Sequence, residues 1–424
     1  MNLKGVKIMK IFKKIILPIM LVCAMLFTLV GCSDNGDVSS LQDQLAQLQQ
    51  ELEDLKGSKA DADKTIEELQ DEIDQIKSAK STADKSYDKI KYIDANLSDR
   101  DCYAGENFKD TQKWIKDLAL AAGYADDAIT TQDVTASKYV KKDEVDSALS
   151  AVDSYTTDGK FYNKSGRSYV EAEDGEYVKA TAVTPNIIIT KPGKSEKQII
   201  VGAHYDGDGT GDNGSGIALA LTTAEELVSI KNNYTIVFVF FTAEEIGCLG
   251  STAYANAMSD EEVANTLYMI NLDSLVCGDY CYLYGGVQNN EEKTVTQTEA
   301  YDNAMEIAES LGLNFRSNPW TWDNLEPTNK TGLPKYASPT TGDWSDHKGF
   351  KNRGIKYLYM EATNWEIPDY TGYGETKLVG MLMNTANDYL EYIETYFPGR
   401  IQHHLSQFAP LLRSLLVQPK VNFE

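Results

Sequence analysis

Five short apolar runs constrain the fold of this chain more than any other feature of its sequence. The longest, Tyr234–Phe241, has no polar side chain after Thr235, which is typical of a strand covered on both faces. The other predicted strands are residues 186–190, 198–203, 267–272 and 355–361. Predicted helices fall between and around them, over 105–123, 216–230, 250–258, 297–311 and 374–396. This alternation predicts an α/β fold with a mainly parallel central sheet flanked by helices.

Histidine and acidic side chains follow the ends of these predicted strands. His204 directly follows the strand over 198–203, and Asp206 lies two residues further on. An imidazole at this place could bind a metal ion while Asp206 receives its other ring N–H. Taken alone, a His-x-Asp sequence such as that at 204–206 more often belongs to an ordinary surface loop. Whether it marks a metal site therefore depends on the residues at the ends of the other strands.

Carboxylates occupy the corresponding places after the next strands. Asp212 precedes the helix over 216–230, where it could cap the helix or bridge two metal ions. Glu244 and Glu245 follow the most apolar strand, and Asp273 follows the strand over 267–272. Two adjacent carboxylates repel each other unless water or a cation relieves the repulsion, and a metal site would relieve it.

A second histidine, His347, lies between Asp346 and the predicted strand over 355–361. Open α/β sheets bind ligands beyond the carboxyl ends of their strands. We therefore expect these imidazole and carboxylate groups to converge at one edge of the sheet. Two imidazoles and three carboxylates form a ligand set that suits zinc. Residues 318–346, rich in Trp, Pro, Thr, Asn and Gly, are expected to form an irregular loop over this site.

Five segments, H-Y-D, D-N-G-S-G, A-E-E-x-G, N-L-D and S-D-H-x-x-F, occur in this order between residues 204 and 350. They resemble the co-catalytic zinc aminopeptidases of clan MH, whose relatives include glutamate carboxypeptidase-like proteins and glutaminyl cyclases. The resemblance covers roughly residues 90–397. It departs from the family after the last strand, where a Y-H-x-x-x-D-T-like segment is usual and residues 369–376 read D-Y-T-G-Y-G-E-T.

The resemblance implies two zinc ions and a role for each matching residue. One ion would be held by His204, Asp212 and Asp273. The second would be held by Asp212, Glu245 and His347, with Asp212 bridging the two ions. Glu244 then matches the general base, and Asp206 matches the residue that orients His204.

Removal of N-terminal amino acids from extracellular peptides is the activity that this resemblance implies, so the expected partner is a peptide with a free N-terminus. Two alternatives stay open. The chain could be another enzyme of the clan, such as a carboxypeptidase or a glutaminyl cyclase-like enzyme, or a metal-free scaffold or receptor. Four tryptophans could line a side-chain pocket or simply pack in the core: Trp320, Trp322, Trp344 and Trp365.

The N-terminus has the pattern of a secretory signal. Lysines precede an apolar run from Ile15 to Val30, which ends in Leu-Val-Gly-Cys at Cys32. This ending resembles the lipobox of bacterial lipoproteins, in which the cysteine is lipidated and becomes the first residue. We therefore predict a lipoprotein signal peptide over 1–31, a tether over 32–40, and a membrane-anchored chain on the extracellular face of a bacterial membrane. An uncleaved signal anchor is the alternative.

Residues 41–84 carry leucine, isoleucine and alanine at alternating spacings of three and four, with charged and amide side chains between them. This pattern predicts a coiled coil that could self-associate or act as a stalk, and the alternative is a solvated single helix. The peptidase domain is then expected over 87–397. Residues 398–424 form a C-terminal tail without a predicted role.

The net charge and the cysteines of the sequence limit the partners, disulfides and metal sites that are expected for the chain. A formal net charge of −24 disfavours nucleic acid as a partner. Four cysteines outside the predicted signal and lipid site could form disulfides in an oxidising exterior: Cys102, Cys248, Cys277 and Cys281. A cysteine zinc site is not expected, because the sequence has no C-x-x-C pair.

Overall fold

The computed structural model describes residues 46–47, 49–50, 82–102, 105–141, 154–156, 162–165, 168–171, 177–323, 336–367 and 374–417. The predicted signal peptide, lipidation site, tether and nearly all of the coiled coil lie outside these residues. No helix in the described ranges combines the length and apolarity needed to cross a bilayer.

Two compact units divide the chain. One comprises Met1–Ser81 and Glu306–Asn314, and the other comprises Thr82–Met305 and Phe315–Glu424. The described residues of the first unit are helical at 46–47 and 49–50 and include the end of one helix, α10. The second unit contains the main sheet, the five predicted metal ligands, Asp206 and Glu244.

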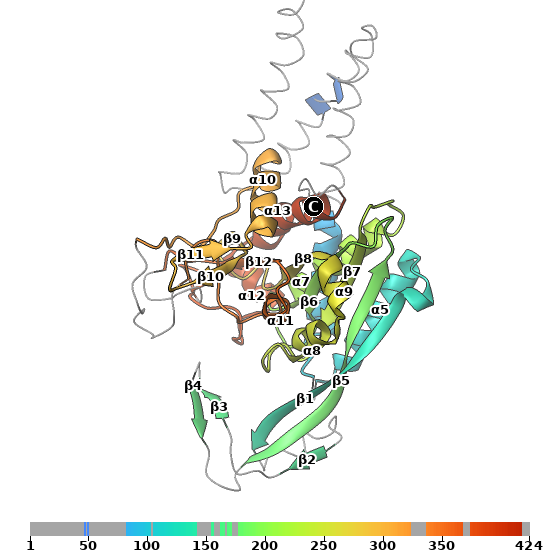
Figure 1. The fold of residues 1–424 in the computed structure, drawn as a ribbon. Coiled ribbons are helices and arrows are strands. Elements are labelled where there is room, and N and C mark those ends of the chain that lie inside the picture. Colours follow the sequence, from blue (N-terminus) through green and yellow to red (C-terminus); the bar gives the residue numbers. More distant parts are fainter. Residues whose placement is uncertain are drawn as a thin grey trace, which may run out of the picture. The chain divides into compact units, whose positions relative to one another are not determined.

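Helices and strands alternate along the second unit, as the apolar runs predict (Figure 1). The helices are residues 82–96, α5 (Phe108–Ala122), α7 (Gly214–Leu227), α8 (Leu249–Ala257), α9 (Asp260–Asn265), α10 (Glu299–Ser310), α11 (His347–Asn352), α12 (Leu390–Tyr396) and α13 (Arg400–Val417), with a short 3-10 turn η3 (Asp126–Ala128). The strands of the main sheet are β1 (Ile129–Lys141), β2 (Ser154–Thr156), β5 (Tyr177–Lys191), β6 (Gln198–His204), β7 (Thr235–Phe241), β8 (Thr266–Leu272), β9 (Tyr280–Tyr284) and β12 (Tyr357–Thr363). Two small hairpins are β3 (Tyr162–Ser165) with β4 (Ser168–Glu171), and β10 (Val287–Asn289) with β11 (Thr294–Thr296).

Eight strands form the main sheet, in the order β1-β5-β7-β6-β8-β12-β9, with β2 paired to β5. The four central strands, β7, β6, β8 and β12, are parallel to one another. Antiparallel strands complete both sides, β5 and β1 next to β7, and β9 next to β12. The prediction of a mainly parallel centre flanked by helices is therefore confirmed.

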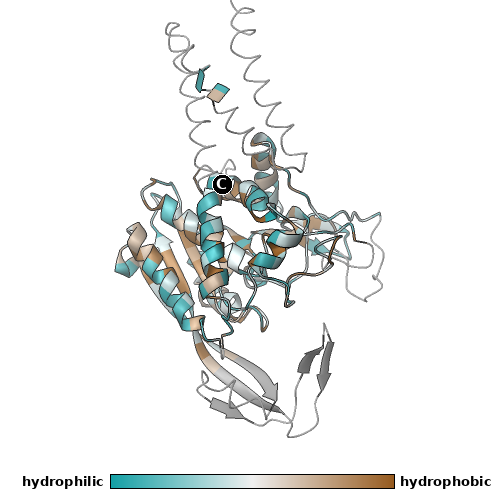
Figure 2. Ribbon diagram, turned by 180° about the vertical axis from the view of Figure 1, so that it is seen from behind, coloured by the Kyte–Doolittle hydropathy of each residue, from teal (hydrophilic) through white to brown (hydrophobic). Residues whose placement is uncertain are grey.

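Both faces of the central strands are buried, which explains why their sequences are apolar without alternation. Alternate side chains of β6, β7 and β8, among them Ile200 and Val239, pack with Phe350 of α11 and Ala255 of α8. On the other face, α7 lies against β6, β7 and β8, and α5 and α13 lie against α7. Figure 2 shows the hydrophobic colouring concentrated on these strands.

Three stretches differ from the sequence prediction. Residues 374–389 are not helical, and only Leu390–Tyr396 of the predicted helix over 374–396 forms one. β5 begins at Tyr177, before the predicted strand over 186–190, and pairs along its length with β1, which the sequence does not predict. The expected tail contains α13, whose buried side chains, including Leu405 and Phe408, pack into the second unit.

The four predicted disulfide candidates are buried, and none of them forms a disulfide in the described residues. Three of the four tryptophans belong to an aromatic cluster built around tyrosines of β9 and β12. Trp365 is buried there, and Trp320 and Trp344 pack against it half-buried. The packing interpretation thus accounts for these three rings.

Candidate metal centre

The carboxyl ends of the parallel strands bring the predicted site residues to one edge of the sheet. His204 is the last residue of β6, where it pairs with Phe241, the last residue of β7. Asp273 follows the last residue of β8 directly. Asp212 lies in the loop between β6 and α7, next to Asn213, whose side chain caps α7 by accepting from the amide of Gly216 at 3.0 Å.

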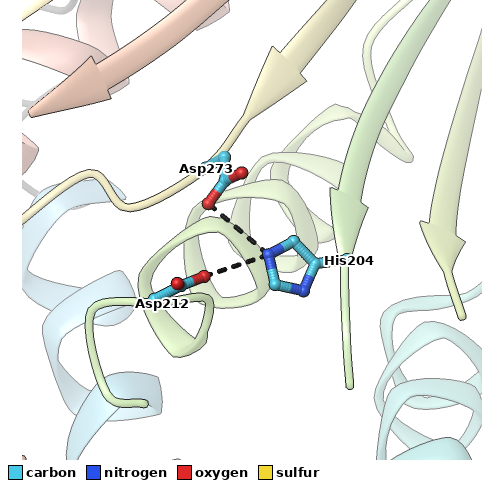
Figure 3. A group of neighbouring side chains, drawn as sticks. All are labelled: His204, Asp212 and Asp273. Atoms are coloured by element: carbon cyan, nitrogen blue, oxygen red, sulfur yellow. Dashed lines mark ion pairs between the residues drawn. The ribbon is translucent and has the colours of Figure 1, made fainter. Parts of the chain in front are cut away.

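His204, Asp212 and Asp273 form a buried cluster of metal-binding side chains. The Nε2 atom of His204 lies 3.1 Å from Oδ1 of Asp212 and 3.4 Å from Oδ1 of Asp273. Figure 3 shows the ring nitrogen facing both carboxylates. One ligand atom from each residue lies within 4.8 Å of the other two. The structure therefore brings the three residues of the first predicted triad together.

Both predicted histidine ligands have one ring nitrogen fixed by the main chain. His204 Nδ1 lies 3.2 Å from the main-chain oxygen of Asp206, and His347 Nε2 lies 3.0 Å from that of Gly342. The opposite nitrogen of His204, Nε2, faces the carboxylates of Asp212 and Asp273. The opposite nitrogen of His347, Nδ1, is buried and has no hydrogen-bond partner among the described residues. Metal-binding imidazoles typically donate one N–H to a carbonyl and leave the other nitrogen for the metal.

The ring of His347 is further held by the aromatic cluster. It stacks on Tyr359, with ring centroids 5.0 Å apart, and lies 4.6 Å from the ring of Tyr357. Burial lowers the pKa of His347 to about 4, so this imidazole is neutral near pH 7. Only a neutral imidazole has a lone pair to offer a metal ion.

Asp206 contacts His204 through its main chain rather than through its carboxylate, which lies 3.8 Å from Nδ1. The two carboxylate oxygens accept hydrogen bonds from the amides of Glu244 at 3.1 Å and Glu245 at 3.3 Å. Asp206 therefore holds the turn after β7 against the loop after β6. The expected orienting contact to His204 is made by the same residue, but by a different oxygen.

Glu244 lies at the cluster, with Oε2 3.9 Å from Nε2 of His204. The thiol of Cys248 donates to its Oε1 at 3.3 Å. Burial raises the pKa of Glu244 well above its usual range, His204 opposes this shift, and Asp346 and Asp273 add to it. A carboxylate in such surroundings has a strong tendency to accept a proton.

Asp273 has the opposite electrostatic environment. Burial alone would raise its pKa, but His204 and the hydroxyls of Ser345 and Ser274 lower it below the usual value. The two hydroxyls donate to it at 2.6 Å and 3.0 Å, and Asn271 in turn donates to Ser345 at 2.7 Å. Asp273 is therefore kept ionised and fixed in orientation, as a metal ligand requires.

Glu245 and His347 are not members of the three-residue cluster among the residues that the structure describes. Glu245 is half-buried and approaches the loop after β6. A Cβ atom added to Gly207 would lie only 2.6 Å from Oε1 of Glu245, and Gly207 has a φ of 98°. This close approach requires glycine at 207 and places the Glu245 carboxylate beside the loop that contains Asp206 and Asp212.

Two residues at the site were not found by sequence reasoning. Asn384 donates to Oδ2 of Asp212 at 3.3 Å, and the carboxylate of Asp388 accepts from the amide of Asp212 at 2.9 Å. Both lie in the stretch predicted to be helical. The available signal was the sequence Asn-Thr-Ala-Asn-Asp at 384–388, because these residue types favour turns over helix interiors.

The donors present fit a zinc site. Carboxylates from Asp206, Asp212, Glu244, Asp273 and Asp346 surround one imidazole, and all of them are buried. Such a group of like charges is costly to bury unless a cation compensates it. Glu244, Asp273 and Asp212 raise the pKa of His204 well above its ordinary value although burial lowers it, which shows how strongly the site attracts positive charge.

Sequence comparisons identify relatives with the same organisation. The model of peptidase family M28 matches residues 186–408. The chain is 30% identical over 286 residues to the alkaline phosphatase isozyme conversion protein of Escherichia coli K12, covering 62% of this chain and 78% of that one. It is 31% identical over 218 residues to aminopeptidase YwaD of Bacillus subtilis 168, covering 49% of this chain but only 40% of the relative.

A solved structure has the same fold. BSAP, a zinc aminopeptidase from Bacillus subtilis, superposes with a TM-score of 0.51 over 80% of this chain and 96% of its own, at 16% identity. At that identity the likeness concerns the fold alone. The match to the family model covers more than half of the 424 residues and includes all five predicted ligands and Glu244. This chain belongs to peptidase family M28.

Proposed function

We propose that this chain is a zinc-dependent aminopeptidase that removes N-terminal residues from extracellular peptides. One observation carries the proposal: in a member of peptidase family M28, the buried cluster of His204, Asp212 and Asp273 lies beside Glu244, whose carboxylate is 3.9 Å from the imidazole. The names of the relatives, among them an aminopeptidase and a zinc aminopeptidase, support the same activity.

Two zinc ions would be held by the five predicted ligands. His204, Asp212 and Asp273 would hold the first ion. Asp212, Glu245 and His347 would hold the second. The unpartnered Nδ1 of His347 and the position of Glu245 beside the Asp212 loop support the second set.

Zinc, when bound, supplies a Lewis acid for the scissile carbonyl and lowers the pKa of water to near 7. Side chains of this protein transfer the protons of the reaction. Glu244 accepts a proton from the attacking water at its carboxylate and later gives the same proton to the leaving amine, so it ends the cycle ionised. Its raised pKa suits both halves of this transfer. Asp206 fixes the turn that carries Glu244 through two amide hydrogen bonds.

A free α-amine is the substrate feature that distinguishes an aminopeptidase from the other enzymes of the clan. The carboxylates around the cluster favour an ammonium group, whereas a carboxypeptidase would need a basic group for the terminal carboxylate. We expect amino-acid anilides to be cleaved about 10–100 times more efficiently, in kcat/KM, than the same compounds with an acetylated amine, because a charge-assisted hydrogen bond contributes about 1.5–3 kcal/mol.

Paired assays of free and acetylated aminoacyl anilides, each with and without a zinc chelator, test this expectation. Cleavage of the free-amine substrate should stop on chelation and return when zinc is added. Equal cleavage of both substrates would exclude the aminopeptidase assignment. A folded, zinc-free chain without any activity would support a scaffold instead.

We also propose that the chain is a lipoprotein anchored through Cys32. Replacing Cys32 by serine should move the protein from the membrane fraction to the soluble fraction, because the lipid would have no attachment site. Cys23→Ser is the matched control, since Cys23 lies inside the predicted signal and its loss should leave the anchor intact. Immunoblots of fractionated cells measure both. Membrane retention of the Cys32 variant would contradict lipidation and indicate an uncleaved anchor.

A further inference from the structure

Arg100 is a fully buried arginine whose side chain contacts the loop between His204 and Asp212. It follows the helix over 82–96 and precedes the region matched by the family model. Its side chain is 0% exposed, which is unusual for a cation, because burial of a guanidinium costs several kcal/mol unless polar partners compensate it. The partners of Arg100 therefore indicate what the residue does.

In the described part of the chain, the hydrogen bonds of the Arg100 side chain all go to main-chain carbonyls. Nε donates to the oxygen of Tyr205 at 3.2 Å, and Nη2 donates to that of Gly209 at 2.8 Å. Nη1 donates to Leu97 at 2.7 Å, which anchors the guanidinium on its own segment. The main-chain amide of Arg100 also donates to Gly207 at 3.1 Å. One residue thus fixes the loop between His204 and Asp212 at three points.

Asp388 holds the far end of the same loop by the opposite chemistry. Its carboxylate accepts from the amide of Gly211 at 2.7 Å and from the amide of Asp212 at 2.9 Å. Its main-chain oxygen accepts from the amide of Thr210 at 3.0 Å. The fit is tight, since a Cβ atom on Gly209 would lie 2.2 Å from a carboxylate oxygen of Asp388.

The two residues act on complementary groups of one segment. Arg100 binds carbonyl oxygens of the loop, and Asp388 binds its amides. Burial lowers the pKa of Arg100, and Asp208, Asp388, Asp206 and Asp212 oppose this shift. With both ends held, the side chain of Asp212 has little freedom, and Asn384 fixes its Oδ2 so that Oδ1 faces His204.

We propose that Arg100 and Asp388 are positioning residues that preset the β6–α7 loop for zinc, so that His204 and Asp212 stand in their binding arrangement before the metal arrives. This inference rests on the proposed zinc function of the site. It gives Arg100, which lies outside the family match, a role in the metal centre. Neither Arg100 nor Asp388 touches substrate or metal in this role.

The test is the zinc affinity of the Arg100→Gln variant of the full chain, measured by competition with a fluorescent chelator. We expect zinc to bind about 10–100-fold more weakly than to the wild type, which is the usual effect of losing a group that orients metal ligands. We expect Asp388→Asn to weaken binding about tenfold, because its amide group can accept only one of the two loop hydrogen bonds. Wild-type affinity in a folded Arg100→Gln variant would overturn the proposal.

Arg353→Gln is the matched control. Arg353 also donates to three main-chain carbonyls, those of Ala255, Asn256 and Met258, at 2.9–3.2 Å, but away from the cluster. A purely structural arginine should lower the Tm of metal-free and zinc-saturated protein equally. We therefore expect Arg353→Gln to keep the zinc affinity of the wild type. For Arg100→Gln we expect zinc to raise Tm less than it does for the wild type, because stabilisation by a ligand depends on its Kd.

The outcomes distinguish failure of the proposed function from failure of the positioning role. If the wild type does not bind zinc, the proposed function fails. If the wild type binds zinc and the Arg100 and Asp388 variants bind it equally well, only the positioning inference fails. Should Arg100→Gln not fold, the decision rests on Arg100→Lys, which keeps the charge but loses the planar fork, together with Asp388→Asn. Unchanged zinc affinity in both would overturn the inference.

Discussion

Replacing Glu244 by glutamine should lower kcat by about 10²–10⁴-fold while zinc stays bound, because the amide cannot accept and return a proton. The substitution keeps the size and shape of the side chain. Its neighbour Glu245 and the other four predicted ligands remain ionisable. The variant therefore removes the proposed base without removing a ligand.

Steady-state kinetics and zinc analysis on the same preparation check this expectation. Glu225→Gln is a suitable control, because Glu225 is a half-buried acid of α7 paired with Lys89 at 2.8 Å, away from the cluster. Its kcat should equal that of the wild type. Unchanged kcat in the Glu244 variant would remove this residue from the mechanism, and loss of zinc would show that it is a ligand instead.

Removing Asp212 should have the second large effect. The wild type is expected to contain about two zinc ions per chain, and Asp212→Ala should contain almost none, since Asp212 would bridge both ions. Substitutions of groups that only orient ligands weaken binding about 10–100-fold, so loss of a shared ligand should weaken binding by more than about 100-fold. Activity should fall below detection with it.

Elemental analysis of the purified variant measures the zinc content, and circular dichroism checks the fold. Asp260→Ala serves as control, because Asp260 is an exposed acid in the first turn of α9 and should not affect either quantity. Two zinc ions per chain in Asp212→Ala would exclude the bridging role. One ion per chain in the wild type would limit the centre to a single metal.

The central part of the fold was predictable from the sequence, because a strand that is buried on both faces has a nearly continuous apolar sequence. The run ending in Phe241 has only apolar side chains after Thr235, within a strand that the structure covers on both sides. The places of His204 and Asp273 followed from the same reasoning, because each lies at the carboxyl end of such a strand. Parallel pairing then brings those ends together.

Other parts of the fold have no comparable sequence pattern. Apart from residues 186–190 of β5, the β1–β5 pair is largely polar, so neither strand period nor apolar run marks the rest of it. The stretch containing Asn384 and Asp388 favours a helix in sequence because apolar residues recur around it, although its turn-forming residues contact Asp212. Arg100 lies far along the chain from Tyr205 and Gly209, and a single residue with distant main-chain partners has no sequence pattern at all.

The parallel arrangement of β6, β7, β8 and β12 also sets the order in which the centre can be completed during synthesis. β7 pairs with one side of β6, β8 pairs with the other side, and β12 then pairs with β8. Two parallel strands must be joined by a crossover connection, so each pairing can form only after that connection has been synthesised. Asp273 emerges from the ribosome well before His347. Under the proposed ligand set, a nascent polypeptide that ends before His347 lacks a ligand of the second ion, so hydrolysis is withheld until the last parallel strand has docked.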